Sequence, residues 1–308
     1  MIKNTVNQPT IGIISPAWAP DKQRLNKGIA YLKSRGLTIV QGRYCREKQG
    51  LFAGSTDQRL EDLHAMFADK SVDAIFCTRG GWGTLKLLDR INYQLIQDNP
   101  KPVIGYSDIT SLQLAIWSRT HVPSLSGPMV AVEMAEKMPG FTEKHLWGQL
   151  ENKNSTYHFR IENFNLINKV SKNTNVRGTL LGGCLSLVVT LLGTPFCPDF
   201  KGSILFLEDV GEQPHKIDRA LAQLYQAGVF GRIKGLILGN FHDCNSSYKG
   251  RGRYTLKEIF DSYFKDSSYP VLINFPYGHG RKIFSLPIGI KATIDFEKHE
   301  LKIKNSFH

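Results

Sequence analysis

The chain has 308 residues, of which 41% are hydrophobic and 21% are charged, and its 39 Lys and Arg residues against 27 Asp and Glu residues give a net charge of +12. This composition excludes a disordered or collagen-like chain and is sufficient for one large domain or two ordinary ones. No apolar run approaches the roughly 20 residues of a membrane helix, so we expect no membrane partner.

The first half of the chain alternates short β-branched runs with helical patterns. This alternation predicts an α/β fold whose parallel sheet has helices on both faces. Strands are predicted over residues 10–14, 37–40, 72–77 and 102–105, and helices over 21–33, from a cap at Ser55 or Thr56 through Phe67, through Leu85 and Leu88, and over 109–118.

A polar region over residues 151–175, rich in Asn and Lys, separates the two halves. We therefore predict an N-terminal α/β domain over 1–160, a linker over 161–176 and a mixed α/β C-terminal domain over 177–308. In the second half, strands are predicted over 179–181, 203–207, 235–238 and 271–275, helices over 185–192, 217–227 and 256–264, and a terminal β-hairpin over 288–296 and 300–303.

The partners and compartment follow from charge and cysteine patterns. The basic residues are spread along the chain, so we expect a small anionic substrate and no nucleic acid. The five cysteines lack CxxC spacing, which predicts neither a disulfide framework nor a zinc ribbon. The apolar residues 11–19 are interrupted by Pro16 and follow a polar stretch, unlike a secretory signal, so we expect a cytoplasmic protein.

Ser107 lies where a buried strand is predicted to turn into a helix. A serine at such a turn is lifted clear of the sheet, beside the unpaired amides at the helix N-terminus. This is the geometry of a nucleophile elbow, although Ile109 takes the place of the last glycine in G-x-S-x-G. Local sequence alone favours the alternative that Ser107 or Asp108 simply caps the helix, because N-cap serines far outnumber nucleophiles.

A nucleophilic serine needs a base, and the chain offers nine histidines. His279 follows a strand and stands between two glycines, which allow a tight bend toward a cleft. The alternative is an ordinary loop histidine. His242 is the main rival, and with Asp243 and Cys244 it suggests a Cys–His pair or a metal site, but the spacing matches no strong metal motif.

The group that orients the base is predicted to be Glu208, at the carboxyl end of an apolar strand. A carboxylate there would fix the tautomer of the histidine and stabilise its protonated form. Asp209 and Glu212 are local competitors, and the acidic cluster could also cap the following helix.

The run Gly80-Gly81-Trp82-Gly83 lacks the Lys-Ser/Thr of a P-loop and the full G-x-G-x-x-G spacing. It is better interpreted as a glycine turn whose backbone approaches another group, such as a second oxyanion donor. Trp82 would then form a wall of the cleft.

The segments around Ser107, Glu208, His279 and the glycine turn belong to a series of short motifs that runs in order along almost the whole chain. This series resembles the LD-carboxypeptidase family of serine peptidases. This family includes cytoplasmic muramoyltetrapeptide carboxypeptidases and microcin-immunity hydrolases. The chain departs from its pattern where Trp82 replaces the usual tyrosine and Cys184 the usual asparagine. The segments are residues 13–16, 52–57, Arg79-Gly80-Gly81-Trp82-Gly83, Gly105-Tyr106-Ser107-Asp108-Ile109-Thr110, 182–186, 193–195, Leu207-Glu208-Asp209 with Glu212, 217–219, 239–241, Gly278-His279-Gly280 and 286–289.

The resemblance implies a catalytic triad of Ser107 as nucleophile, His279 as general base and acid, and Glu208 as the group that orients it. It implies an oxyanion hole from the amides of Gly81 and Asp108, with Gly80 as an alternative to Gly81. It also implies a nucleotide-fold-like N-terminal domain, a mixed C-terminal domain, no metal or organic cofactor, and often a homodimer.

The expected reaction is hydrolysis of the amide before a C-terminal D-amino acid, releasing D-alanine from muropeptide tetrapeptides during peptidoglycan recycling. One alternative is a microcin-type hydrolase of peptidyl-nucleotides, for which Trp82 or Trp18 would stack on the base. Another is a non-catalytic muropeptide-binding protein, and a Cys244 hydrolase is more distant. The sequence leaves open whether lysine or diaminopimelate precedes the D-alanine.

Overall fold

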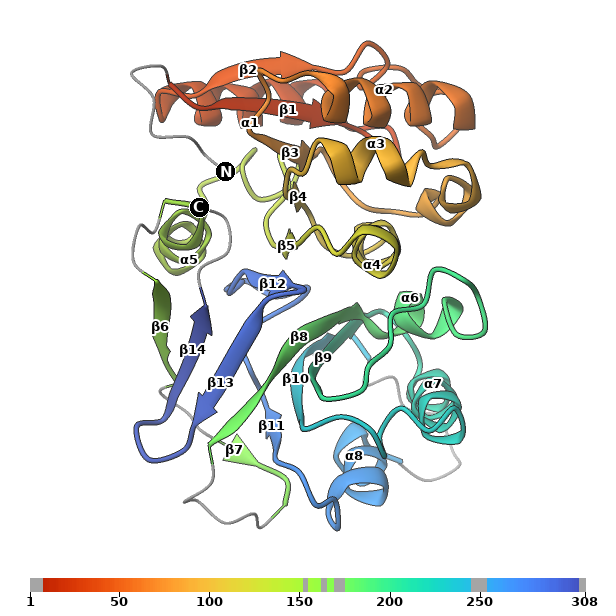
Figure 1. Cartoon of the computed structure of the whole chain (residues 1–308), viewed down its shortest axis with the longest axis vertical. Helices are drawn as coiled ribbons and strands as arrows, with labels where there is room; N and C mark the ends of the chain where they lie inside the picture. Colours follow the sequence, from red (N-terminus) through yellow and green to blue (C-terminus); the bar gives the residue numbers. More distant parts are fainter. Residues whose placement is uncertain (1–7, 152–154, 162–164, 169–174, 245–253, 305–308) are drawn as a thin grey trace.

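The computed structural model describes residues 8–151, 155–161, 165–168, 175–244 and 254–304. Two β-sheets dominate it, and they lie one above the other in Figure 1. The upper sheet is built mainly from the first half of the chain and the lower sheet from the second. Among the described residues, no helix is both long enough and apolar enough to cross a lipid bilayer.

The first sheet has the strand order β12-β5-β4-β3-β1-β2. All its neighbouring strands are parallel except β12 and β5, which are antiparallel, so the predicted parallel sheet is confirmed. The strands are β1 (Thr10–Ile14), β2 (Thr38–Gln41), β3 (Ala74–Cys77), β4 (Val103–Ile104), β5 (Ser124–Ser126) and β12 (Leu286–Ile288).

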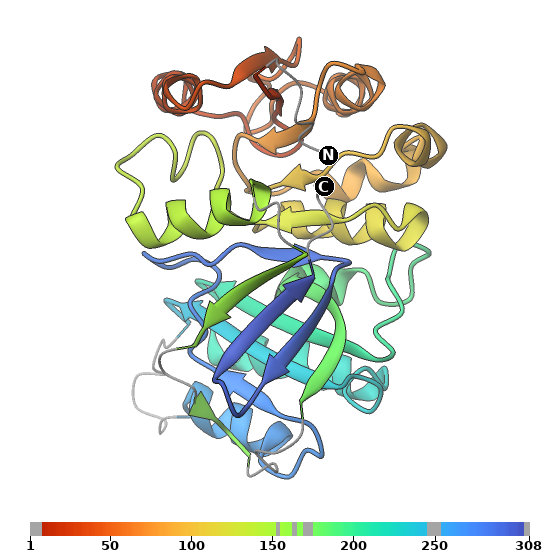
Figure 2. The same ribbon diagram turned by 60° about the vertical axis from the view of Figure 1, so that its left-hand side comes forward.

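Helices cover both faces of this sheet, as strand–helix alternation requires. Figure 2 shows α1 and α5 on one side and α2, α3 and α4 on the other. The helices are α1 (Lys22–Ser34), α2 (Thr56–Ala68), α3 (Tyr93–Asp98), α4 (Ile109–Thr120) and α5 (Gly140–Leu150).

Local sequence explains where α2 begins. The Ser55 hydroxyl accepts a hydrogen bond from the Gln58 amide at 3.2 Å, and the Gln58 side chain accepts one from the Ser55 amide at 2.8 Å. This capping box satisfies two amides that a helix start leaves unpaired, so Ser55 and not Thr56 is the cap.

The helix predicted through Leu85 and Leu88 is wrong. The chain forms two short 3₁₀ turns there, η1 (Thr84–Lys86) and η2 (Leu88–Arg90). Gly83, which precedes them, has a φ of 122°, and the Thr84 amide donates a hydrogen bond to the Asp108 carboxylate instead of extending a helix.

The second sheet has the order β6-β14-β13-β8-β9-β10-β11-β7, and its four central strands from β8 to β11 are parallel. The outer strands run antiparallel to their neighbours, so the sheet is mixed, as predicted. The strands are β6 (Thr156–Arg160), β7 (Asn165–Leu166), β8 (Val176–Cys184), β9 (Ser203–Val210), β10 (Gly235–His242), β11 (Val271–Ile273), β13 (Lys291–Asp295) and β14 (Glu300–Lys304). The helices of this half are α6 (Leu185–Thr190), α7 (Pro214–Gln226) and α8 (Leu256–Phe264).

The two halves of the chain exchange strands. β12, from the second half, pairs with β5 of the first sheet, whereas β6 pairs with β14 of the second sheet. The polar region that we interpreted as the junction thus contains two strands, β6 and β7. The domain ranges 1–160 and 177–308 stay a prediction.

Candidate active site

Ser107 lies in the turn between β4 and α4, as its sequence context predicts. Its φ is 64°, a left-handed conformation that is uncommon for a residue with a side chain. Asp108, one of the two capping candidates, occupies the N-cap position of α4, but its side chain makes no capping hydrogen bond, and Ser107 precedes the cap. A strained serine that does not cap the helix is consistent with a functional role.

Asp108 instead ties the start of α4 to the glycine turn. Its buried carboxylate accepts a hydrogen bond from the Thr84 amide at 3.0 Å, and the Thr84 hydroxyl lies 2.9 Å from the same oxygen. Burial raises the pKa of Asp108, while the Thr84 bonds and the nearby charge of Arg59 act in the opposite direction. These bonds hold the turn and the helix end in one fixed arrangement.

The glycine turn lies directly against the serine. A Cβ atom added to Gly80 would lie 3.0 Å from Ser107 Oγ and 3.4 Å from the Asp108 amide nitrogen. Only a glycine therefore leaves space in front of both groups. Gly81 has a φ of 122°, and a Cβ there would lie 2.3 Å from the Trp18 ring. The structure thus brings Gly80, Gly81 and Asp108 to the serine, and their roles in an oxyanion hole stay a prediction.

Glu208 and His279 form a direct contact. His279 Nδ1 lies 2.7 Å from Glu208 Oε2, and the His279 amide donates to the same oxygen at 3.1 Å. Glu208 is fully buried near the end of β9, whereas the His279 side chain keeps 19% of its surface exposed. When Nδ1 donates its proton to this carboxylate, Nε2 is free to accept another proton.

Gly278 makes this contact possible. Its φ is 93°, and a Cβ atom there would lie 2.4 Å from Glu208 Oε2. Both the backbone conformation and the lack of space thus require glycine beside the histidine. The sequence argument that flanking glycines allow a tight bend is correct for this position.

The environment makes His279 a stronger base. Burial by itself lowers the pKa of His279, but the hydrogen bond and negative charge of Glu208 outweigh it, and the charges of Asp209 and Glu133 add to them. The net effect is a pKa above the usual 6.5. An imidazole of this kind can take a proton from a hydroxyl and return it to a leaving amine.

Tyr106 links the turn that carries Ser107 to His279. It precedes Ser107, and its ring centroid lies 4.8 Å from that of His279. Among the described residues there is no direct hydrogen bond between Ser107 Oγ and the imidazole. Catalytic hydrogen bonds are often long without substrate and tighten when it binds.

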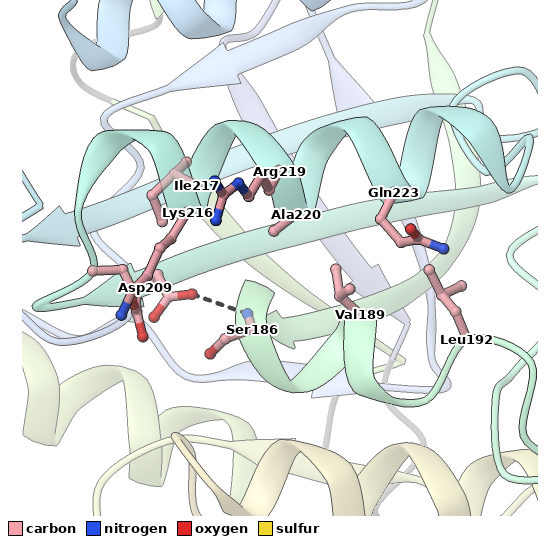
Figure 3. Close-up of a pocket in the computed structure, with 10 residues that line it drawn as sticks. Ser186, Val189, Leu192, Asp209, Lys216, Ile217, Arg219, Ala220 and Gln223 are labelled. Atoms are coloured by element: carbon pink, nitrogen blue, oxygen red, sulfur yellow. Dashed lines mark hydrogen bonds and ion pairs between the residues drawn. The ribbon is translucent and has the colours of Figure 1, made fainter.

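The two competitors of Glu208 face elsewhere. Asp209 and Glu212 line a pocket of about 430 Å³ between α6 and α7, shown in Figure 3. The Asp209 carboxylate accepts from the Ser186 amide at 2.9 Å, and Glu212 pairs with Lys216 at 3.0 Å. Successive side chains on a strand point to opposite faces, so β9 directs Glu208 to the histidine and Asp209 to this pocket.

The rival site around His242 does not form. His242 is exposed at the end of β10 and pairs only loosely with Asp243, at 3.4 Å. Burial raises the pKa of Cys244 to about 11, which keeps it a neutral thiol. Within the part of the chain that the structure describes, no three His, Cys, Asp or Glu side chains are grouped to hold a metal ion.

Aromatic rings stand beside the glycine turn, where we expected a wall. Trp82 is 52% exposed and contacts Trp18 and Phe52 edge-on, with centroids 5.3 and 6.1 Å apart. The guanidinium group of Arg79 lies 5.1 Å from the centre of the Trp18 ring. This side of the site is therefore aromatic and positively charged.

Sequence reasoning missed two polar residues of the site, Thr84 and Glu133. Thr84 joins the glycine turn to Asp108, and Glu133 accepts a hydrogen bond from Tyr106. Thr84 follows the glycine run directly, which could have drawn attention to it, but no motif marks Glu133.

Comparisons with known proteins find similar sequences and structures. The sequence profile of the LD-carboxypeptidase N-terminal domain matches residues 11–127, and that of the LD-carboxypeptidase C-terminal domain matches residues 177–294. A probable murein peptide carboxypeptidase of Bacillus subtilis is 34% identical over 93% of this chain and 88% of its own length. The microcin C7 self-immunity protein MccF of Escherichia coli is 28% identical over 97% of this chain and 94% of its own length. The crystal structure of muramoyltetrapeptide carboxypeptidase from Oxalobacter formigenes superposes with a TM-score of 0.84 and 27% identity, covering 96% of this chain and 98% of that one.

Proposed function

Because this chain belongs to the LD-carboxypeptidase family, we propose that it is a serine carboxypeptidase that releases D-alanine from the tetrapeptide stem of muropeptides. The observation that carries the proposal is the contact of His279 with the buried Glu208 at 2.7 Å, together with the packing of the His279 ring on Tyr106, the residue before the strained Ser107. The murein and muramoyltetrapeptide names of its relatives support the choice of substrate. So does the net charge of +12, which suits a peptide bearing several carboxylates.

In this mechanism the Ser107 hydroxyl attacks the carbonyl before the C-terminal D-amino acid while His279 Nε2 takes its proton. Glu208 holds the Nδ1 proton and stabilises the imidazolium. The amides of Asp108 and of Gly81 or Gly80 bind the tetrahedral oxyanion, and each such donor contributes about 3–4 kcal/mol. His279 then protonates the departing amine, and water activated by the same imidazole releases the acyl group from Ser107.

Replacement of Ser107 with alanine tests the nucleophile. The wild-type protein and the Ser107→Ala variant are incubated with a muramoyl tetrapeptide, and free D-alanine is measured over time. We expect the variant to lose at least about a thousandfold in rate, because removal of a triad member typically costs this much or more. Undiminished release by a folded Ser107→Ala variant would show that the assigned nucleophile is wrong.

A second candidate function is hydrolysis of a peptidyl-nucleotide. The exposed ring of Trp82 favours it, because an aromatic surface beside the nucleophile can stack on a base, and one relative is a microcin self-immunity protein. Mass spectrometry after incubation with tetrapeptide, pentapeptide and peptidyl-nucleotide substrates separates the two functions. A muropeptide-binding protein without activity would leave all three intact.

The proposal includes a cytoplasmic location and a homodimer, as the family resemblance implies. Muropeptide recycling takes place where released stem peptides are reused, which suits a cytoplasmic enzyme. Sedimentation velocity over a range of protein concentrations tests the dimer, and a purely monomeric species would exclude it.

A further inference from the structure

A carboxylate from another part of the chain, Glu133, acts on His279 in addition to Glu208 and Asp209 of β9. Glu133 lies in the segment that follows β5, and it is among the charges that raise the pKa of the imidazole. Its Oε1 accepts a hydrogen bond from the Tyr106 hydroxyl at 2.7 Å, and its Oε2 accepts one from the Met129 amide at 2.9 Å. Both oxygens are therefore held in fixed directions.

Tyr106 connects this carboxylate to both catalytic side chains. It is only 4% exposed, it directly precedes Ser107, and its ring packs on the His279 ring at an interplanar angle of 57°. Burial raises the pKa of Tyr106 well above 10, so the hydroxyl keeps its proton and donates it to Glu133. Movement of the Tyr106 ring away from the imidazole would break this hydrogen bond.

The segment that carries Glu133 is itself fixed to the first sheet. Arg24 of α1 donates to the carbonyl oxygens of Ala131 and Val132, both at 2.9 Å. The Ala131 amide donates to the Thr78 carbonyl oxygen at 2.8 Å, just beyond β3. Glu133 is thus held by the same sheet that carries the nucleophile.

The charged state of Glu133 depends on opposing effects. Burial raises the pKa of Glu133, and the bonds from Met129 and Tyr106 and the positive charge of His279, which favour the carboxylate, offset this only in part. The ionisable groups that act on His279 are Glu208 and Asp209 from β9 and Glu133 from the segment that follows β5. A positive imidazole near several carboxylates is more stable than one near a single carboxylate.

We propose that Tyr106 and Glu133 form a positioning pair for His279. Glu133 holds the Tyr106 hydroxyl, the Tyr106 ring supports the plane of the imidazole next to Ser107, and the charge of Glu133 adds to that of Glu208 in stabilising the imidazolium. This inference rests on the proposed function, because it assigns the pair to the histidine of that reaction.

Titration of His279 by NMR tests the charge of Glu133 without any substrate. In protein with labelled histidines, the His279 signal is identified by its absence in His279→Asn. We expect Glu133→Gln to lower the pKa of His279 by about half a unit or more, because a nearby negative charge is removed. Glu136→Gln is the matched control: this carboxylate is on the same segment but pairs with Arg24 at the surface, and it should leave the titration unchanged.

Enzyme kinetics test whether the Tyr106 ring, held by Glu133, supports the imidazole of His279. Tyr106→Phe keeps the ring and removes the hydroxyl, so we expect kcat for D-alanine release to fall about tenfold with KM nearly unchanged. In Glu133→Gln the acid limb of kcat/KM should move to lower pH together with the pKa of His279. Glu133→Asp, which keeps the charge but shortens its reach, replaces Glu133→Gln if circular dichroism shows that the latter does not fold.

Two results would overturn the inference: an unchanged His279 titration in Glu133→Gln, and wild-type kcat in Tyr106→Phe. A wild-type protein that releases no D-alanine from any tetrapeptide would instead contradict the proposed function. The NMR titration would still report on the pair in that case, so the two failures are distinguishable.

Discussion

Gly80 offers the sharpest test of the space in front of the nucleophile. A methyl group there would lie 2.9 Å from Ser107 Cβ, and this is about 0.5 Å shorter than the 3.4 Å at which ordinary contact begins. It would also lie 3.0 Å from Ser107 Oγ. Relief requires Ser107 to move by about half an ångström, and misplacement of about 1 Å can cost a hundredfold in rate. Half of that displacement corresponds to about a tenfold loss, so we expect Gly80→Ala to lower kcat for D-alanine release about tenfold.

The assay combines D-alanine release with thermal unfolding, so that loss of activity is separated from loss of fold. Gly140→Ala is the matched control, because a Cβ at that glycine would meet nothing within 4 Å, and it should keep wild-type kcat. Gly80 does not have a positive φ, so its substitution acts through the contact with Ser107 and not through the backbone. A folded Gly80→Ala variant with wild-type kcat would refute the packing that the structure assigns to the glycine turn.

Three further expectations concern strain and titration. Because Ser107 has a φ of 64°, Ser107→Gly should be more stable to urea than Ser107→Ala by about 1 kcal/mol, and equal stability would contradict the strain. Because Glu208 raises the pKa of His279, kcat/KM should rise with pH through a midpoint above 6.5, and Glu208→Gln should lower that midpoint. The same pair should stabilise the fold fully below pH 6.5, and this stabilisation should be lost as the pH rises through the raised pKa of His279. Burial lowers the pKa of His145 to about 4, so the melting temperature should fall as the pH drops from 6.5 toward 4, and a His145→Phe variant with the same pH dependence would disprove this cause.

The regular elements were predictable because each is encoded by local sequence. Helix α8 spans the predicted residues 256–264, and β1 spans the predicted residues 10–14. Short polar strands were missed for the opposite reason. β6 and β7 are strands because they pair with distant β14 and β11, and no property of the polar region 151–175 reveals those partners.

The candidate site likewise contains residues that local sequence predicts and residues that it does not. The turn around Ser107 was predictable from the strand and helix that flank it, whereas the contact between Glu208 and His279 joins residues 71 positions apart. Only the order of family motifs suggested that pair, and spacing alone left Asp209 and Glu212 open. No sequence pattern pointed to Glu133, because it is connected to the site by a hydrogen bond from the distant Tyr106 and not by a motif in its own segment.

The exchange of strands joins the sheet that carries Ser107 to the sheet that carries Glu208. Ser107 follows β4 of the first sheet and Glu208 belongs to β9 of the second, so their separation depends on how the sheets are joined. The His279 loop spans this junction, because it begins after β11 in the second sheet and ends at β12 in the first.

β12 pairs with β5, which neighbours β4, and the Tyr277 hydroxyl lies 2.8 Å from that of Ser126 at the end of β5. Pro287 is compatible with this position because β12 is the edge strand, where a missing amide proton breaks no ladder. The pairing of β12 with β5 therefore anchors the end of the loop that carries His279 to the sheet that carries Ser107.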